Sequence, residues 1–368
     1  MPSKKSFSSS NNRIAEVLQP FVDSCTLAGA VALVASKEGV LALETVGYAD
    51  IAAKKPMQPD SFFWIASISK PITATALMML VDEGKVSIED PVETYVPEFK
   101  EVMVGIKQEN DQILLKKPDR CITIKHLLSQ TSGLPFMTPL EQPVMDKLPL
   151  ADLVKLYALL PLLSEPGTQF QYSNENFSAA GRIIEIVSGM PYEDFLATRL
   201  FEPLGMKDTT FWPNDEQIGR QAKVYKPNEA KTALEESPII YLNYPLSDRI
   251  RRHPTPGGGL FSTANDLSIF GRMILAGGVL DGKSYVSEAS IREMSRRQTP
   301  GELAESYGLG WWTPDQTFDH GGAYATHLWL DPRKQLVTVL LMQHAGFPNP
   351  EDGQKIEGAF KEAAERMA

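Results

Sequence analysis

Ser67 and Lys70 stand three residues apart and could form a nucleophile and its base. They lie in the run FFWIASISKP at residues 62–71, which opens a predicted helix. Residues at i and i+3 of a helix share one face, so the amine can reach the hydroxyl. A free serine hydroxyl is a weak nucleophile, and a desolvated lysine can accept its proton. A capped helix with a solvated lysine has the same pattern, so the interpretation depends on two further elements.

The second element is Tyr172-Ser173-Asn174, which follows a turn at residues 165–171 and precedes a predicted helix. A tyrosine hydroxyl near a lysine ammonium should have a lowered pKa, because the cation favours the phenolate. Tyr172 could then take a proton from serine and return it to a leaving group. The Asn174 amide could bind a substrate carbonyl or hold the lysine. Taken alone, this pattern fits a surface tyrosine and a helix cap equally well.

The third element is His320-Gly321-Gly322-Ala323, directly before a predicted strand at residues 324–330. Two glycines at a strand entrance would let a substrate approach the backbone closely. The backbone N–H groups of Ala323 and Ser67 could then form an oxyanion hole. A flexible turn is the alternative for this element. The fixed order of the three elements, each in a suitable context, indicates serine-based acyl transfer.

The segments that must position these residues predict an α/β fold of the α+β type. We expect one antiparallel sheet from both chain ends, flanked by terminal helices, with a mostly helical domain inserted in the middle. The expected domains are 12–66 plus 300–368 for the sheet and 67–299 for the helical part, with 1–11 disordered. Predicted strands are 28–35, 40–48, 308–312, 324–330 and 336–342. Predicted helices include 12–24, 124–129, 151–160, 178–187, 266–275 and 353–366.

The helix that begins near Ser67 has an apolar stripe, which predicts that one face packs on the core and fixes Ser67 rigidly. Gly84 is the expected stop of this helix. The stripe consists of Ile68, Ile72, Ala76, Met79 and Leu80.

Composition excludes several function classes. The 368 residues carry a net charge of −10, which argues against nucleic-acid binding. The five histidines lack the His-Glu-x-x-His pairing of a metallohydrolase, and we expect neither a metal nor a cofactor. Cys25 and Cys121 are too few for a disulfide framework and are expected to be buried. No apolar run reaches membrane-helix length. We recognise no signal peptide, so a cytoplasmic protein and a mature form without its leader both fit, and the oligomeric state stays open.

Three further features have structural interpretations. We expect at least one of Trp311 and Trp312 to lie in the core, while the other could line an acyl pocket. His126 precedes an apolar helical run and is expected to be structural. The basic residues Arg249, Arg251, Arg252 and His253 fall in a predicted loop, where such clusters are usually solvated.

The three elements and several longer phrases resemble the serine β-lactamase and penicillin-binding-protein superfamily. The match is to its class C-like branch of esterases, D-amino peptidases and β-lactamase-related hydrolases, and it covers most of the chain. The resemblance implies an acyl-enzyme on Ser67, with Lys70 and Tyr172 sharing the general-base and general-acid work. The longer phrases lie at residues 126–135, 165–174, 191–206, 257–266 and 307–311.

One departure from that family bears on the substrate. Many penicillin-recognising members have Lys-Thr-Gly or Lys-Ser-Gly where this chain has His320-Gly321-Gly322. The missing lysine and hydroxyl help to bind a substrate carboxylate, and histidine is mostly neutral at pH 7. We therefore expect a carboxylesterase acting on small, short-chain esters. The alternatives are a D-amino-acid peptidase or amidase, a weak class C-like β-lactamase, and a binding protein that retains the fold. An α/β-hydrolase is disfavoured because no G-x-S-x-G occurs.

Overall fold

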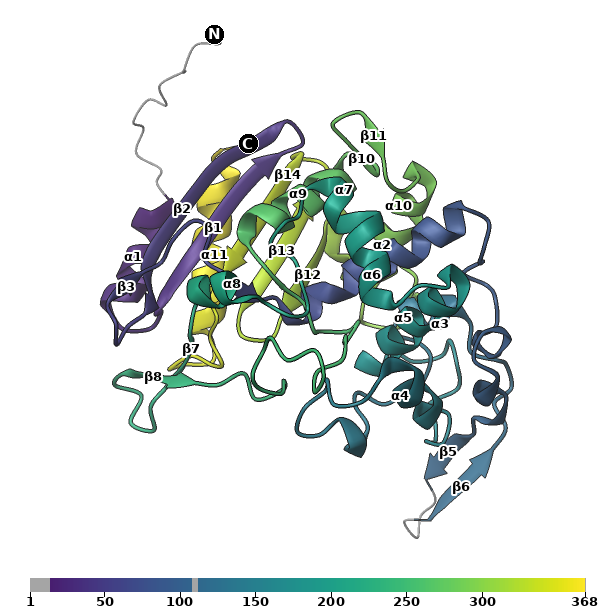
Figure 1. Ribbon diagram of the computed structural model, residues 1–368. Helices are drawn as coiled ribbons and strands as arrows, with labels where there is room; N and C mark the ends of the chain where they lie inside the picture. The colour runs from purple at the N-terminus through teal and green to yellow at the C-terminus, as the bar shows by residue number, and fades with distance from the viewer. Residues whose placement is uncertain (1–13, 108–111, 368) are drawn as a thin grey trace.

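A six-stranded antiparallel sheet forms the centre of the computed structural model, which describes residues 14–107 and 112–367 (Figure 1). The first and last parts of the chain meet in this sheet, where β1 pairs with β14 and Leu33 lies opposite Val339. The prediction of one sheet built from both chain ends is therefore confirmed. Residues 1–11, expected to be disordered, lie outside the described residues. The strand order is β12 (Phe318–Gly322), β13 (Thr326–Asp331), β14 (Leu336–Leu341), β1 (Gly29–Ser36), β2 (Gly39–Asp50) and β3 (Lys55–Pro56).

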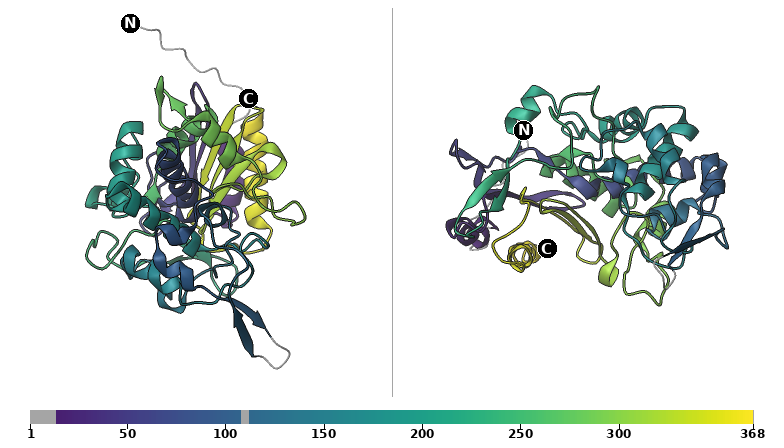
Figure 2. Two further views of the ribbon diagram at one scale, coloured as in Figure 1. Left: turned by 90° about the vertical axis from the view of Figure 1, so that its right-hand side faces the viewer. Right: turned by 90° about the horizontal axis from the view of Figure 1, so that it is seen from below.

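Helices cover both faces of the sheet (Figures 1 and 2). The terminal helices α1 (Ile14–Asp23) and α11 (Asp352–Glu365) pack on one face, where Ala32 and Val34 of β1 join their apolar side chains. The other face carries α9 (Ala264–Leu275), together with Val31 and Leu33. Alternate residues of β1 thus serve two different apolar layers, as the period of two along a strand requires. The expected terminal helices are confirmed, and α9 packs on the sheet although it comes from the middle of the chain.

Most of the remaining helices gather beside the sheet, around α2 (Ser69–Asp82), whereas α8 (Asp215–Arg220) lies apart from them near β1 (Figure 1). Every residue of α2 from Ser69 to Leu80 is buried, so the predicted single apolar face was too narrow. The helix lies between the sheet and the helical region and therefore meets protein on all sides. It ends at Asp82, and Gly84 follows with φ of +67°. These other helices are α3 (Ile124–Leu128), α4 (Leu150–Tyr157), α5 (Asn174–Ser188), α6 (Tyr192–Leu196), α7 (Glu202–Leu204), α8 (Asp215–Arg220) and α10 (Glu288–Ser295).

Small two-stranded sheets interrupt the helical region more often than predicted. The pair formed by β4 (Phe63–Trp64) and β9 (Phe261–Ser262) matters for function, because it ties the chain just before Ser67 to the chain just after residue 260. These strands are too short to give a periodic signal in the sequence. The others are β5 (Val104–Lys107) with β6 (Ile113–Lys116), β7 (Val224–Pro227) with β8 (Leu234–Ser237), and β10 (Val279–Leu280) with β11 (Lys283–Ser284).

The strand predicted at 308–312 is wrong. The chain turns there: the Gly308 N–H donates to the Trp311 carbonyl at 2.8 Å, and Gly310 has φ of +82°. The His320-Gly321-Gly322 element also differs from expectation, because it ends β12, the edge strand of the main sheet. Glycines have low strand propensity, which hid this strand. Its pairing with β13 comes from tertiary context.

Two expectations about burial are also wrong. Cys25 and Cys121 are exposed free thiols. Arg252 is buried rather than solvated, and its Nε donates to the buried Asp146 carboxylate at 2.6 Å. Its guanidinium also donates to the carbonyls of Phe211 and Leu246, so its charge and donors are satisfied inside the protein. The neighbouring Arg249 and Arg251 are exposed, as expected.

His126 has the structural role that was expected. Its Nδ1 accepts from the Thr123 N–H at 3.1 Å, and the Thr123 hydroxyl accepts in turn from the His126 N–H, which caps α3. Within the described parts of the chain, no helix is both long and apolar enough to cross a membrane.

Candidate active site

Ser67 lies in a short 3₁₀ turn, Ala66–Ile68, directly before α2 rather than inside it. Ala66 has φ of +45°, a left-handed conformation that costs energy for a residue with a side chain. Ser67 remains half-buried, whereas Ser69 is fully buried and donates its hydroxyl to the Ala66 carbonyl at 2.6 Å. Of the two serines in the motif, Ser67 is the accessible one.

Lys70 projects from the first turn of α2 and is completely buried. Its Nζ lies 3.1 Å from the Ser67 hydroxyl oxygen, 2.7 Å from Asn174 Oδ1 and 2.6 Å from the Gly257 carbonyl oxygen. Burial lowers the pKa of Lys70 well below its ordinary value, because the charged form loses its hydration.

These contacts suit a neutral amine. A neutral lysine has two N–H groups and one lone pair, whereas the ammonium has three N–H groups. Asn174 Oδ1 and the Gly257 carbonyl can only accept, so they can take both N–H groups of the amine. The lone pair then faces the Ser67 hydroxyl, which is the arrangement that a general base needs.

Tyr172 reaches the same place from the loop before α5. Its hydroxyl is near enough to the Ser67 side chain to interact with it, and its ring centroid lies 4.7 Å from Lys70 Nζ. The expected lowering of the Tyr172 pKa is wrong: burial raises this pKa, and the interaction with Ser67 offsets only part of the rise. The buried lysine does not supply the cation that a phenolate would need. Tyr172 is thus placed as a protonated hydroxyl.

Asn174 holds the lysine, one of the two roles expected for it. It is the first residue of α5, and its N–H donates to the Phe136 carbonyl at 3.1 Å. The second acceptor of Lys70, Gly257, was not recognised from the sequence. A Cβ on Gly257 would lie 3.1 Å from Asn174 Oδ1, so glycine lets this loop approach the site. The run of three glycines at 257–259 was the available signal.

His320 on β12 is buried and neutral. Its Nδ1 lies 2.7 Å from the Gly321 carbonyl, which only accepts, so Nδ1 carries the hydrogen. Its Nε2, 3.1 Å from the Tyr307 hydroxyl, is then the acceptor. Burial is the main cause that lowers the pKa of His320 well below its ordinary value. The prediction that this position lacks a cation at pH 7 agrees with that shift.

The end of β12 packs against the turn of Ser67. A Cβ on Gly322 would lie 2.3 Å from the Ile65 carbonyl oxygen, so only glycine allows this approach. Gly321 lies at the edge of the neighbouring cavity, and Ala323 is exposed beyond the strand. The pairing of the Ala323 and Ser67 N–H groups as an oxyanion hole stays a prediction.

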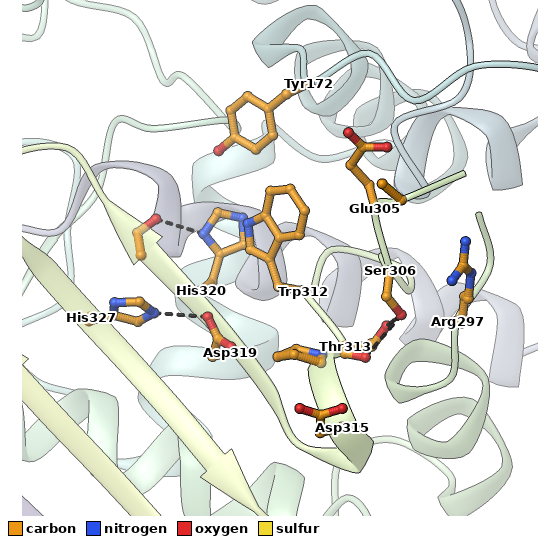
Figure 3. A pocket seen from close by; sticks show the side chains of 13 residues that line it. Tyr172, Arg297, Glu305, Ser306, Trp312, Thr313, Asp315, Asp319, His320 and His327 are labelled. Carbon is orange, nitrogen blue, oxygen red and sulfur yellow. Dashed lines mark hydrogen bonds and ion pairs between the residues drawn. The ribbon is translucent and has the colours of Figure 1, made fainter. Parts of the chain in front are cut away.

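A cavity of about 930 Å³ opens beside these residues (Figure 3). Tyr172, Trp312 and His320 line it, and Trp312 stacks parallel to Tyr172 with ring centroids 6.5 Å apart. Trp311 instead lies in the core, stacked on Phe270, so one tryptophan is structural and the other lines the cavity.

The charged lining of this cavity is mainly acidic. It includes Glu305, Asp315 and Asp319, against one guanidinium, that of Arg297. The Nε and one terminal nitrogen of Arg297 donate to backbone carbonyls of residues 299, 300 and 303. Asp319 accepts from His327 at 2.8 Å. His327 lines the cavity too, and its hydrogen bonds with Asp319 and Glu357 raise its pKa although burial opposes this, so it offsets part of the acidic lining. The three carboxylates still outnumber Arg297 and His327, so the cavity suits neutral groups better than carboxylate-bearing ones.

Comparison with known proteins identifies the family of this chain. The Beta-lactamase family profile matches residues 14–360. This chain belongs to that family. Protein Rv1367c of Mycobacterium tuberculosis is 31% identical over 367 residues, covering 88% of this chain and 87% of its own. Esterase EstB of Burkholderia gladioli is 27% identical over 359 residues, covering 87% of each.

Solved structures support the fold of this family member. EstCE1, described as a hydrolase with promiscuous acyltransferase activity, superposes with a TM-score of 0.76 at 24% identity. The superposition covers 94% of this chain and 97% of that protein. The chain is therefore a member of the serine hydrolase superfamily with the β-lactamase fold, and the predicted fold class and family resemblance are confirmed.

Proposed function

We propose that this family member is a carboxylesterase that forms an acyl-enzyme on Ser67. The observation that carries the proposal is the environment of Lys70. Its buried amine lies 3.1 Å from the Ser67 hydroxyl, and its two other close partners are acceptors. A neutral base is thereby poised on a half-buried serine, and Tyr172 beside that serine lines the cavity.

In acylation, the Ser67 oxygen attacks the ester carbonyl while Lys70 accepts the hydroxyl proton. The backbone N–H groups of Ser67 and Ala323 would stabilise the negative charge on the carbonyl oxygen. The C–O bond to the alcohol then breaks. Tyr172, which keeps its proton because burial raises its pKa, donates to the departing alkoxide and is reprotonated from Lys70. The products are the acyl-serine and a free alcohol.

Deacylation uses the same groups in reverse. Water takes the place of the alcohol and gives a proton to the Tyr172–Lys70 pair as it attacks the acyl-serine. Breaking the serine ester returns the proton to the Ser67 oxygen and releases the carboxylic acid. The electrically neutral pair can serve both half-reactions because neither group needs a net charge in the resting enzyme.

Neutral esters suit this site better than β-lactams or D-amino-acid peptides. A β-lactam carboxylate would meet the neutral His320 where related enzymes have a lysine, and the adjoining cavity is mainly acidic. EstB, at 27% identity, is an esterase by name. Amidase, β-lactamase and non-catalytic binding activities are the outcomes that the tests below separate.

A fluorophosphonate probe followed by peptide mapping tests the nucleophile. We expect the adduct on Ser67, and Ser67→Ala should lower kcat on p-nitrophenyl butyrate by several orders of magnitude. Ser69→Ala is the matched control: it removes the hydrogen bond to Ala66 but should still be labelled. Absence of labelling and of ester turnover in the folded wild-type protein would favour a binding protein instead.

A further inference from the structure

Gln130 holds the backbone on both sides of Tyr172. It follows α3, is completely buried and has φ of +62°. Its backbone carbonyl accepts from the Gln171 N–H at 2.8 Å, and its side-chain Oε1 accepts from the Ser173 N–H at 2.9 Å. Gln130 therefore accepts the backbone N–H groups of both residues that flank Tyr172.

The orientation of the Gln130 amide is fixed by its partners. Besides the Ser173 N–H, Oε1 accepts from Asn176 Nδ2 at 2.6 Å, and the Asn176 Oδ1 accepts from the Ser132 hydroxyl. Both groups at Oε1 are donors, so the oxygen must face them and the NH₂ group must point the other way.

The NH₂ group of Gln130 is near Tyr307, whose hydroxyl is hydrogen-bonded to His320. Nε2 is buried and has no hydrogen bond of good geometry among the described residues. The Tyr307 hydroxyl is close enough for the amide to offset part of the rise in the Tyr307 pKa that burial causes, so we regard the contact as a long one. A buried amide donor without a good acceptor is costly, which makes Tyr307 its natural partner.

In each hydrogen bond beyond Gln130, the donor is the residue nearer to Gln130. Tyr307 donates to His320 Nε2, and His320 Nδ1 donates to the Gly321 carbonyl at the edge of the cavity. Because Tyr307 donates there, its oxygen is free to accept from Gln130. One buried residue thus connects Tyr172, which would move protons, with the His320-Gly321 strand, which would receive the substrate.

We propose that Gln130 is a positioning residue that aligns Tyr172 and the His320 strand with each other. The inference rests on the proposed esterase function. Within the described parts of the chain, Gln130 makes no hydrogen bond to Ser67 or Lys70. Misplacing Tyr172 should impair proton transfer in the transition state more than binding of the ester, so kcat should fall while KM changes little.

Gln130→Glu gives the sharpest test, because glutamate has nearly the same shape as glutamine. The substitution changes only the group that would donate to Tyr307. A protonated carboxyl can still donate toward Tyr307, whereas a carboxylate can only accept. At low pH, where the new carboxyl is protonated, we expect the ratio of variant to wild-type kcat on p-nitrophenyl butyrate to be near one. It should fall at least about tenfold as the new carboxyl ionises, with KM within about threefold. The groups facing this carboxyl are Tyr307, Asn176 and the Ser173 N–H, and none of them ionises below neutral pH.

Three further variants complete the experiment. Gln130→Leu removes both the oxygen that accepts from the Ser173 N–H and the amide that would donate to Tyr307, so its kcat should be reduced at every pH. Tyr307→Phe removes the hydroxyl between Gln130 and His320, leaves the hydrogen bonds of Gln130 to residues 171 and 173 intact, and should lower kcat. In the double variant with Gln130→Glu, the pH dependence of the ratio should disappear. Gln343→Glu is the matched control. Gln343 is also buried, also has positive φ and also accepts one backbone N–H, that of Trp64, but it lies outside this chain of hydrogen bonds. The ratio of Gln343→Glu to wild-type kcat should not change with pH.

The outcomes separate this inference from the proposed function. A wild-type enzyme that hydrolyses esters, with a Gln130→Glu ratio that is flat in pH and within threefold of one, would overturn the positioning role alone. A folded wild-type protein that neither hydrolyses esters nor reacts with the probe would overturn the proposed function. If neither Gln130 variant folds by circular dichroism, Tyr307→Phe decides, and an unchanged kcat there would refute the inference.

Discussion

Asn174 Oδ1 lies 2.7 Å from the Lys70 amine, so the first residue of α5 sets the direction of the base in the first turn of α2. The partner is a neutral amide. It accepts an N–H group without adding a negative charge, so it does little to oppose the effect of burial on the lysine. The lowered pKa of Lys70 depends on this choice of partner.

Asn174→Asp should move the acidic limb of the pH–rate profile to higher pH. A carboxylate next to Lys70 stabilises the ammonium form and raises the lysine pKa, so a neutral base becomes available only at higher pH. We expect the limb of kcat/KM to shift upward by at least about one pH unit. Asn174→Ala removes the acceptor without adding charge, so it should reduce kcat with little upward shift. An unshifted limb in the Asp variant would mean that Lys70 is not the titrating base.

Lys70 and Tyr172 should behave as one proton-transfer unit. The lysine amine lies over the tyrosine ring, and both groups contact Ser67. Lys70→Ala and Tyr172→Phe should each lower kcat by a factor of about 10³ or more, and the double variant should be little worse than either. Steady-state kinetics on one ester would measure all three. Losses that multiply in the double variant would mean that the two groups act independently.

The fold could largely be predicted because its sheet comes from long, regular segments. The apolar runs of β1, β2 and β14 and the amphipathic helices α1 and α11 carry strong local patterns. By contrast, β12 contains His320, Gly321 and Gly322, which give no strand signal, and its pairing with β13 depends on tertiary contacts. The hairpins of the helical region have at most four residues in each strand, which is too short for a period to show.

For the site, the sequence revealed side chains with distinctive chemistry and missed those that act through the backbone or from a distance. Ser67, Lys70, Tyr172 and Asn174 have recognisable types and spacing, and the structure brings them together. The Gly257 carbonyl has no side chain to suggest its contact with Lys70. The direction of the Tyr172 pKa shift was mispredicted because it depends on burial, which local sequence does not specify.

Glu175→Gln should stabilise the protein at neutral and alkaline pH. Glu175 follows Asn174 on α5, is completely buried, and neither carboxyl oxygen has a hydrogen-bond partner among the described residues. Burial, with a smaller effect from Glu141, raises its pKa from 4.5 to about 9. The folded state therefore keeps the proton while the unfolded chain loses it above its pKa of 4.5. The stability that Glu175 contributes is complete below that pH and is lost as the pH rises to about 9.

Glutamine has nearly the same shape and does not ionise, so it avoids that loss. We expect a gain in the free energy of unfolding of roughly 1–3 kcal/mol at pH 7. The gain should be larger at pH 9 and small at pH 5. Urea denaturation at the three pH values measures it, with Glu362→Gln on the exposed face of α11 as the control. A gain that is the same at all three pH values would show that Glu175 is ionised in the folded protein.

Substrate preference should follow the charge at position 320. A site that pairs a buried carboxylate loses on the order of 2–5 kcal/mol without the partner cation, which is roughly 30- to several-thousand-fold in rate. His320 is neutral and the adjoining cavity is mainly acidic, so a cephalosporin should suffer this loss and a neutral ester should not. We expect kcat/KM for p-nitrophenyl butyrate to exceed that for nitrocefin by at least about a hundredfold. D-alanyl amides, assayed in the same panel, report on the peptidase alternative.

His320→Lys tests whether the missing cation causes the preference. It should raise the nitrocefin-to-butyrate ratio of kcat/KM, whereas His320→Gln, which is polar but uncharged, should leave that ratio nearly unchanged. Both variants disturb the hydrogen bonds to Tyr307 and Gly321, so a fall in overall rate common to both measures that disturbance. The change in the ratio measures the charge alone. A wild-type enzyme that hydrolyses nitrocefin as fast as the butyrate ester would contradict the esterase assignment and make the chain a β-lactamase with an unusual third element.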